Sequence, residues 1–401
     1  MATGRLYYDD SFEKEFTAQV LSCEPMLYET AQAWGVVLDR TALYPTSGGQ
    51  PHDLGRLGEA NVLDVRDEGE EILHLVDQPL QRGAVNGCVN WPRRFDHMQQ
   101  HTGQHLLSAM FQERFGRPTV SFHLGTDLST IDLRGPEPSD EILEGVEHAA
   151  NQIIFEDRAV NVRYGTAEDL AQLGVRKEVE RAGILRAIEI EAADLQPCGG
   201  THVKRTGQIG TLLVRRCTKI RQDWRVEFVC GARAERFARQ DFLHLRKAAE
   251  KLSCAPEEVV ASAERALSER DAHFKSAQAA LQRLAETDAA QAVLATQPGT
   301  NGLRVIARVF EGVEAEYLGH LAAQIAKTER SIALLARLGC GHLIFAQHPS
   351  AGKDMSDLLK QVLSKIGGKG GGTRDFARGR LNDPTLGEKA VAFATELLAD
   401  R

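Results

Sequence analysis

The sequence predicts a mixed α+β protein built from several domains. Its 401 residues are more than one hydrophobic core usually covers. Short β-branched runs bounded by glycine and proline alternate with longer runs at helical spacing. With 42% hydrophobic and 26% charged residues, the chain also has the composition of a folded globular protein and not of a disordered one.

Residues 1–95 are expected to form a small N-terminal β-barrel. Alternating or β-branched stretches at 34–45 and 60–76 are separated by turn-forming residues such as the glycine and proline of 47–51. Several short strands divided by such turns are typical of a barrel or a meander.

Residues 96–235 are expected to form an α+β domain. The texture changes near Asp96, where apolar residues at helical spacing continue without a helix breaker until Gly116. Strand-like runs follow, and Ser139 with Asp140 provides the cap and the acidic first turn of a second helix. Further short strands reach Cys230.

The last two segments differ from each other in composition. Residues 236–295 are rich in Ala, Glu and Arg, and they predict an antiparallel helical hairpin or a short coiled coil. The heptad positions are Val260, Leu267, Phe274 and Leu281, although Arg270 interrupts the stripe. Residues 296–401 alternate strand-like and helical runs, which predicts a small C-terminal α/β domain.

Charge and cysteine content indicate a cytoplasmic protein without a membrane span. No run of about 18 apolar residues occurs, and the acidic start lacks the apolar stretch of a secretory signal. Seven scattered cysteines are typical of a reducing compartment. The net charge of −8 does not favour a nucleic-acid partner, but the segment 204–225 holds seven basic residues and one acid. That run fits either a solvated surface or a phosphate contact.

Two short motifs carry candidate metal ligands. His101 and His105 are four residues apart in the predicted helix, so both imidazoles lie on one helix face. Cys198 and His202 are also four apart, separated by a Gly-Gly-Thr segment that lets the backbone bend. Three imidazoles and one thiolate form a donor set that suits one tetrahedral zinc ion, Zn²⁺.

Two other chemistries fit the motifs less well. The metalloprotease pattern H-E-x-x-H requires a glutamate next to the first histidine, and this chain has Thr102 there, so a peptidase would lack its general base. The glycine-rich segment 367–372 is not a P-loop, since no Lys-Ser or Lys-Thr pair follows its last glycine.

At these motifs the sequence resembles the editing and C-terminal domains of alanyl-tRNA synthetases. HTGQHLLSAMF and CGGTHVKRTGQIGTLLV resemble the two metal-ligand motifs of the editing domain, and WRVEFVCGARA resembles the run that follows them. LYPTSGGQPHDLGRL is similar to the loop of the preceding barrel, and GGKGGGTRDFARG to the glycine loop of the C-terminal domain associated with DHH phosphoesterases. Only 100 residues precede His101, which leaves no room for an aminoacylation core. The nearest family is the long form of the stand-alone AlaX editing proteins.

The resemblance implies a trans-editing hydrolase. Its substrate would be tRNA(Ala) charged with serine, and next glycine, and its zinc would be held by His101, His105, Cys198 and His202. The implied substrate-binding residues are Thr46, Gly48, Gly49, Gln50, Ser121, His123, Gly199, Gly200 and Thr201. The implied tRNA-binding residues are Gly368, Lys369, Gly370, Gly371, Gly372 and Arg374. Thr102 and Gln104 are expected to be polar residues of the helix face.

Two positions depart from the synthetase pattern, and alternatives stay open. His123 stands where synthetases tend to have Gln, and Lys369 replaces the usual Arg of the glycine loop, which keeps the charge but removes a bidentate fork. A non-catalytic tRNA-binding partner of a synthetase and a hydrolase of small molecules are alternative functions. A homodimer through the C-terminal domain also stays open.

Overall fold

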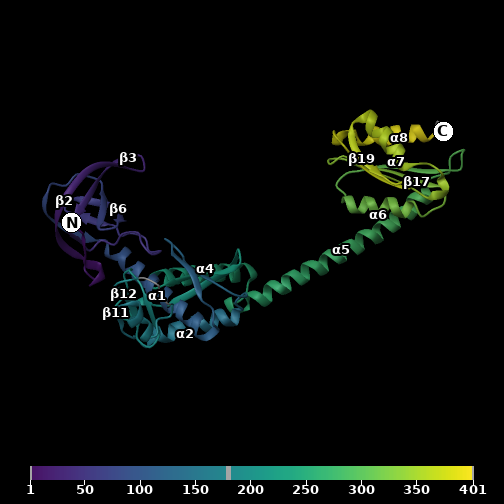
Figure 1. Cartoon of the computed structure of the whole chain (residues 1–401). Helices are drawn as coiled ribbons and strands as arrows, with labels where there is room; N and C mark the ends of the chain where they lie inside the picture. The colour runs from purple at the N-terminus through teal and green to yellow at the C-terminus, as the bar shows by residue number, and fades with distance from the viewer. Residues whose placement is uncertain (1, 178–181, 400–401) are drawn as a thin grey trace. The chain divides into compact units, whose positions relative to one another are not determined.

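The computed structural model describes residues 2–177 and 182–399, which divide into two compact units, 1–247 and 248–401 (Figure 1). Each unit combines helices and sheets, and this confirms the expected α+β class with several domains. Among the described helices, none combines the length and the apolar character that crossing a membrane requires.

Six N-terminal strands close into a barrel in the order β2-β3-β7-β6-β5-β8. Buried and exposed residues alternate along β2 and β8, as expected for strands with one face in a core. Valine, leucine and isoleucine side chains fill the interior. The strands are β2 Glu15–Tyr28, β3 Ala31–Leu38, β5 Gly55–Leu57, β6 Ala60–Glu68, β7 Glu71–Val76 and β8 Gly83–Val89, and a short parallel pair joins β1 Gly4–Arg5 to β4 Arg40–Thr41.

The helix α1, Trp91–Phe115, follows the barrel and carries the first two candidate ligands. It begins five residues before the predicted start near Asp96. The Asn90 side chain accepts a hydrogen bond from the Arg93 amide, and Pro92 occupies the first turn. It ends at Gly116 in the left-handed conformation. Most of α1 is buried, so side chains on several of its faces meet other parts of the unit.

Two antiparallel sheets surround α1. One has the order β14-β15-β10-β9 and the other the order β11-β12-β13. Helix α2 packs against α1 within the same core. The bounds are β9 Thr119–Leu124, β10 Ser129–Leu133, α2 Asp140–Phe155, β11 Val160–Gly165, α3 Ala167–Gln172, β12 Leu185–Ile190, β13 Asp194–Pro197, β14 Leu212–Ile220 and β15 Asp223–Cys230.

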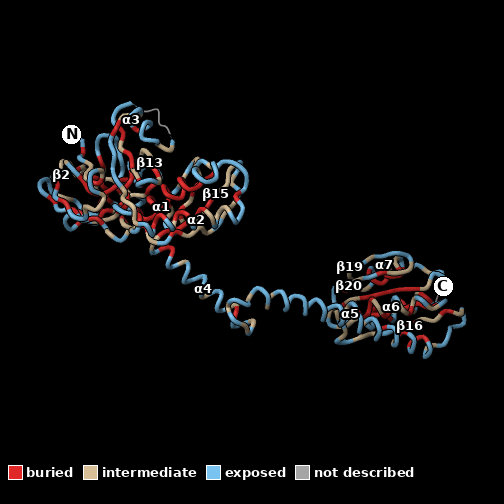
Figure 2. The backbone as a smooth tube through the Cα atoms, turned by 90° about the horizontal axis from the view of Figure 1, so that it is seen from below, coloured by how far each residue is buried: buried red, intermediate tan, exposed pale blue. Residues whose placement is uncertain are grey.

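Two long helices follow, α4 Ala232–Leu252 and α5 Val259–Ala295. The heptad residues in the first half of α5 are exposed, with Val260 at 71%, Leu267 at 53% and Phe274 at 64% (Figure 2). The last turns of α5 instead pack on α6 through small side chains such as Ala285 and Ala289. The heptad stripe is therefore exposed in the first half of α5 and packed against α6 near its end.

A five-stranded sheet of order β16-β17-β18-β20-β19 forms the C-terminal unit. Successive residues of its strands face opposite cores: α6 covers one face, and α7 with α8 covers the other (Figure 1). The bounds are β16 Arg304–Phe310, α6 Ala315–Ile325, β17 Ser331–Arg337, β18 His342–Gln347, α7 Met355–Ile366, β19 Gly368–Gly372, β20 Phe376–Leu381 and α8 Gly387–Ala399.

The glycine-rich segment forms the edge strand β19. Gly370 pairs with Gly379 of β20, and a Cβ at Gly370 would lie 2.6 Å from the Arg378 carbonyl oxygen and 2.9 Å from Leu363 of α7. The glycines thus let this strand approach β20 and α7 closely. Sequence composition indicated a loop here because the short-range pattern lacks the β-branched residues that mark strands.

Candidate metal centre

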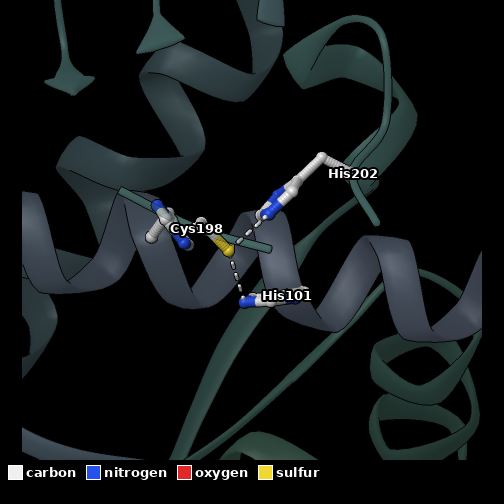
Figure 3. Close-up of side chains that lie close together, drawn as sticks. His101, Cys198 and His202 are labelled. Atoms are coloured by element: carbon white, nitrogen blue, oxygen red, sulfur yellow. Dashed lines mark hydrogen bonds between the residues drawn. The ribbon is translucent and has the colours of Figure 1, made fainter. Parts of the chain in front are cut away.

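Four side chains from two distant segments meet beside α1. His101 and His105 come from the helix, and Cys198 and His202 come from the segment after β13. Their donor atoms all lie within 4.8 Å of one another. The Cys198 sulfur lies 3.5 Å from Nε2 of His101 and 3.3 Å from Nε2 of His202 (Figure 3). Three imidazoles and a thiol in this spacing fit one tetrahedral metal ion.

Hydrogen bonds on the far sides of the rings orient two of the histidines. The Nδ1 atom of His101 lies 2.8 Å from Oε1 of Gln50, and Nδ1 of His105 lies 3.0 Å from a carboxylate oxygen of Asp194. Both oxygens are acceptors, so Nδ1 of each ring carries the hydrogen and Nε2 presents a bare lone pair. Arg176 holds the other oxygen of Asp194 at 2.7 Å.

His202 also carries its hydrogen on Nδ1 and leaves Nε2 without one. Its Nδ1 atom lies 3.1 Å from the Thr102 hydroxyl, which donates its own hydrogen to the Met98 carbonyl at 2.8 Å. Because that hydrogen is used, the hydroxyl accepts from His202, and Nε2 is again bare. Three bare ring nitrogens that converge with a thiol would repel one another without a cation, and such outer partners are typical of metal-ligating histidines.

The electrostatics of the cluster favour a thiolate. Burial opposes charge on Cys198, but the neighbouring His101 and His202 imidazoles outweigh it and lower the pKa of the thiol well below its usual value. Burial likewise opposes charge on His105, but the hydrogen bonds to Asp194 and Cys198 raise the pKa of this imidazole to about 9. The cluster thus stabilises a thiolate and favours a cation beside it, either a proton on Nε2 of His105 or a metal ion in its place.

A fully buried ion pair joins the barrel to the helix that holds the ligands. Arg94 and Asp53 are both 0% exposed, and the guanidinium Nε donates to the carboxylate at 2.9 Å. Asp53 also accepts from the Tyr44 amide at 2.7 Å, and Arg94 donates to the Ser11 carbonyl at 2.9 Å. These bonds fix the loop between β4 and β5 against α1, and this loop contains Gln50.

The loop around Cys198 fits closely against His101. A Cβ at Gly200 would overlap the His101 ring, so only glycine allows this approach. Arg186 of β12 steadies the loop by donating to the carbonyls of Cys198 at 2.7 Å and Gly200 at 3.0 Å. The Cys-Gly-Gly sequence is thus explained by contact between its backbone and a ligand ring.

A pocket of about 460 Å³ opens beside the cluster. Five of the nine expected substrate-binding residues line it, together with three of the four ligands. The lining residues are Tyr44, Ser47, Gly48, Gly49, His101, Gln104, His105, Thr119, Val120, Ser121, Phe122, Arg176, Lys177, Gln196, Pro197, Cys198, Gly199 and Gly200.

The other four expected residues are not among those that line it. Gln50 and Thr201 are buried and bond to each other, with Gln50 Nε2 donating to the Thr201 hydroxyl at 2.8 Å. Thr46 bonds to the ring of His52 at 3.1 Å. His123 pairs with Thr130 across β9 and β10 and is exposed.

Several residues of the site carried no sequence signal. Phe122 packs on the His101 ring at a centroid distance of 5.5 Å. Asp194 and Arg176 precede Cys198 in the chain. Asp194 bonds to His105, and Arg176 bonds to Asp194. The Asp194 contact depends on how the chain folds back, and residue spacing does not encode it.

A second, basic pocket of about 640 Å³ lies in the C-terminal unit between α6 and the sheet edge. Of the expected tRNA-binding residues, Lys369 lines this basic pocket, and Arg378 and Arg380 of β20 line it too. Arg374 lines a different pocket, where its Nε donates to the Lys353 carbonyl at 3.2 Å. The glycines of β19 pair with β20, and the three cations are exposed.

Comparisons with known proteins cover both units. The family described as the threonyl and alanyl tRNA synthetase second additional domain matches residues 185–225, and the DHHA1 domain matches residues 302–400. The alanine–tRNA ligase of Pyrococcus abyssi is 31% identical over 99% of this chain, but the chain spans 44% of the length of that ligase.

Two relatives match almost from end to end. The alanyl-tRNA editing protein AlaX-L of Pyrococcus horikoshii is 30% identical over 94% of this chain and 94% of its own length. The alanyl-tRNA editing protein Aarsd1 of Mus musculus is 30% identical over 97% of each. With the metal cluster and both domain matches in place, the chain belongs to the family of alanyl-tRNA editing proteins.

Proposed function

We propose that the protein is a trans-editing hydrolase that removes the amino acid from mischarged tRNA(Ala) in the cytosol. The observation that carries this is the buried His₃Cys cluster in the wall of a pocket large enough for an aminoacyl group. Ser-tRNA(Ala) is the main substrate and Gly-tRNA(Ala) the second. A synthetase pocket built for alanine rejects glycine or serine weakly, since one methyl or hydroxyl group is worth only about 1–3 kcal/mol there.

We assign one zinc ion per chain to this cluster. Nitrogen and thiolate donors together favour zinc over magnesium or calcium, which prefer oxygen ligands. The three outer partners support the assignment, because they leave every Nε2 free to ligate. Bound zinc would supply positive charge beside the ester and fix the position of the substrate.

The residues of the chain position and shield the scissile ester. Gly199 and Gly200 offer close backbone approach next to the ligands, and Phe122 covers the His101 ring from the side of β9. Arg176 and Lys177 line the same pocket and provide positive charge for a phosphate of the tRNA end. Water attacks the ester carbonyl carbon, and the bond from that carbon to the ribose oxygen breaks.

A proton acceptor for this water is supplied by the substrate itself. Within the described lining, the pocket has no aspartate or glutamate, and its two histidines belong to the ligand set. We therefore assign proton transfer to the hydroxyl next to the ester on the terminal ribose, which accepts a proton from the attacking water while its own proton passes to the leaving ribose oxygen. A tRNA that lacks this hydroxyl is expected to be cleaved much more slowly.

We propose that each domain of the chain has its own role. The barrel of 1–95 supplies the loop that supports His101, and 96–235 is the zinc-containing editing domain. Residues 236–295 form a helical-hairpin or coiled-coil linker, and 296–401 bind the elbow or acceptor arm of tRNA through the glycine-rich edge and its cations. A homodimer would form through the C-terminal domain 296–401.

A deacylation assay tests the proposed function. Purified protein is incubated with tRNA(Ala) charged with serine, glycine or alanine, with and without a chelator, and metal content is measured by mass spectrometry. Hydrolysis of the seryl and glycyl esters, loss of this activity on chelation and about one zinc per chain are expected. Absence of hydrolysis with all three substrates contradicts the proposal.

The alternative is a tRNA-binding partner that does not catalyse hydrolysis. His101→Ala separates the two functions, because it removes a ligand and leaves the C-terminal unit unchanged. A hydrolase loses turnover but keeps its affinity for tRNA, whereas a binding partner shows no change in either. His148→Ala, on the exposed side of α2, is the matched control.

A further inference from the structure

Gln104 occupies an unusual place in the pocket wall. It lies in α1 between the two ligand histidines and lines the pocket that they line. Its side chain is only 3% exposed. A long polar side chain this deeply buried normally has all its hydrogen-bonding groups paired.

Only one end of the Gln104 amide has a partner. Nε2 donates to the Ser108 hydroxyl at 2.9 Å, and the same hydroxyl accepts from Thr119 at 2.8 Å. The carbonyl oxygen Oε1 is buried and has no hydrogen-bond partner within residues 2–177 and 182–399. With the nitrogen bonded to Ser108, the oxygen is the end of the amide that is left without a partner in the described part of the chain.

The unpaired atom is an acceptor, so it suits a ligand that brings a hydrogen-bond donor. The described lining of the pocket contains two cations, Arg176 and Lys177, and no carboxylate. An aminoacyl ester brings two kinds of donor, its α-amino group and, for serine, the side-chain hydroxyl. A neutral amide oxygen compensates little of the charge of an ammonium group, whereas it pairs well with a neutral hydroxyl.

We infer that Gln104 determines specificity for the seryl group, with Oε1 accepting the hydrogen of the serine side-chain hydroxyl. This rests on the proposed function, because it assumes that the pocket holds the aminoacyl end of tRNA. Glycine fits the pocket without this bond. An alanyl group lacks the hydroxyl and cannot donate this bond, which is worth roughly ten- to a hundredfold in binding relative to serine.

The first test removes the acceptor and keeps the side-chain length. Gln104→Met is expected to lower kcat/KM for Ser-tRNA(Ala) by about tenfold or more and to change kcat/KM for Gly-tRNA(Ala) by less than about threefold. The control is Gln99→Met, a buried glutamine of the same helix that bonds to the Gln208 carbonyl and is absent from the described lining of the pocket. It is expected to leave the serine-to-glycine ratio unchanged.

The second test changes the substrate and leaves the protein intact. The 2-aminobutyryl group has the size of the seryl group with a methyl in place of the hydroxyl. Wild-type protein is expected to cleave 2-aminobutyryl-tRNA(Ala) about tenfold more slowly than Ser-tRNA(Ala), and Gln104→Met is expected to abolish that difference. This comparison remains valid if the variant folds poorly, because its first half uses only wild-type protein.

Three outcomes would overturn the inference: an unchanged serine rate in Gln104→Met, an equal loss for serine and glycine, or equal wild-type rates with seryl and 2-aminobutyryl esters. Each of these requires that the wild-type protein cleaves mischarged tRNA(Ala). A wild-type protein with no activity on any of the esters refutes the proposed function instead, so the two failures are distinguishable.

Discussion

Gln50 shows how one buried side chain can organise a metal ligand. Its Oε1 accepts from the His101 ring at 2.8 Å and from the Thr201 amide at 3.1 Å, while its Nε2 donates to the Thr201 hydroxyl. Both the oxygen and the nitrogen of its amide are thus hydrogen-bonded within the protein. The side chain thus fixes both a ligand ring from α1 and the segment that carries the ligands Cys198 and His202.

Gln50→Leu is expected to lower zinc affinity by about 10- to 100-fold, because loss of an outer hydrogen bond frees the His101 ring and its tautomer. Competition with a fluorescent zinc chelator measures the change. Gln78→Leu, an exposed glutamine of the same domain, is the control. Equal affinities of Gln50→Leu and wild type would show that Gln50 does not orient the ligand.

His74 makes the stability of the barrel depend on pH. It is 0% exposed, and burial lowers the pKa of its imidazole to about 4, although the Val36 carbonyl partly opposes this. The unfolded chain binds this proton near pH 6.5, so between pH 6.5 and 4 the unfolded state holds more protons. Stability is therefore complete above pH 6.5 and falls as pH is lowered towards 4.

From this shift, His74 is expected to remove about 2 kcal/mol of stability between pH 7.5 and 5. His74→Gln should lose that part of the pH dependence, measured as the change in the free energy of unfolding of the N-terminal unit. His148→Gln, exposed on α2, should keep the full dependence. Identical slopes for the two variants would contradict the assignment to His74.

At the scale of elements, α1 must approach β15 closely for its ligands to reach the loop of Cys198. Gly103 permits this, since a Cβ there would overlap the Cys230 sulfur. Gln100 reinforces the contact by donating to the Cys230 carbonyl at 3.0 Å and accepting from its amide at 2.9 Å. The glycine between the two histidines is thus needed for helix–sheet contact.

Gly103→Ala is expected to lower the free energy of unfolding by about 1–3 kcal/mol through overpacking, although alanine is the better helix former. Cys230→Ala removes the sulfur and leaves Cγ2 of Ile209 at 3.5 Å and the Cβ of residue 230 at 3.6 Å from the new methyl group. The double variant should therefore recover stability relative to Gly103→Ala alone. Additive losses in denaturant unfolding would refute the contact as the cause.

At the scale of the whole molecule, chemistry and tRNA binding are assigned to different units. The metal cluster lies in unit 1–247, and the basic pocket lies in unit 248–401. The overall charge of −8 therefore conceals a local cationic surface. Phosphate contacts depend on that local surface and are sensitive to salt.

Replacing Lys369, Arg378 and Arg380 with alanine is expected to raise KM for charged tRNA and leave kcat unchanged. The slope of the logarithm of the tRNA-binding constant against the logarithm of the salt concentration should fall in magnitude by about 2–3. Filter binding at several salt concentrations measures that slope. A control of equal charge replaces lysines of α7 and α8 on the other side of the sheet: Lys360, Lys365 and Lys389. An equal effect of both triple variants would mean that total charge, and not this pocket, binds tRNA.

The sequence by itself determined the two pairs of candidate metal ligands and the α+β class. Spacing of four within a helix and a Cys-Gly-Gly-Thr-His segment are local features, and local geometry follows from nearby residues. The same reasoning could not foresee β19, where a Cβ at Gly368, Gly370 or Gly372 would approach the backbone of β20 too closely.

Only the tertiary structure decided which partners the ligands acquire. Gln50, Asp194 and Thr102 reach the histidines across 51, 89 and 100 residues of chain, distances over which spacing carries no information. The same holds for the unpaired oxygen of Gln104, because whether a polar atom finds a partner depends on every element packed around it. Local sequence sets which atoms are available, and long-range packing sets which of them are left for a substrate.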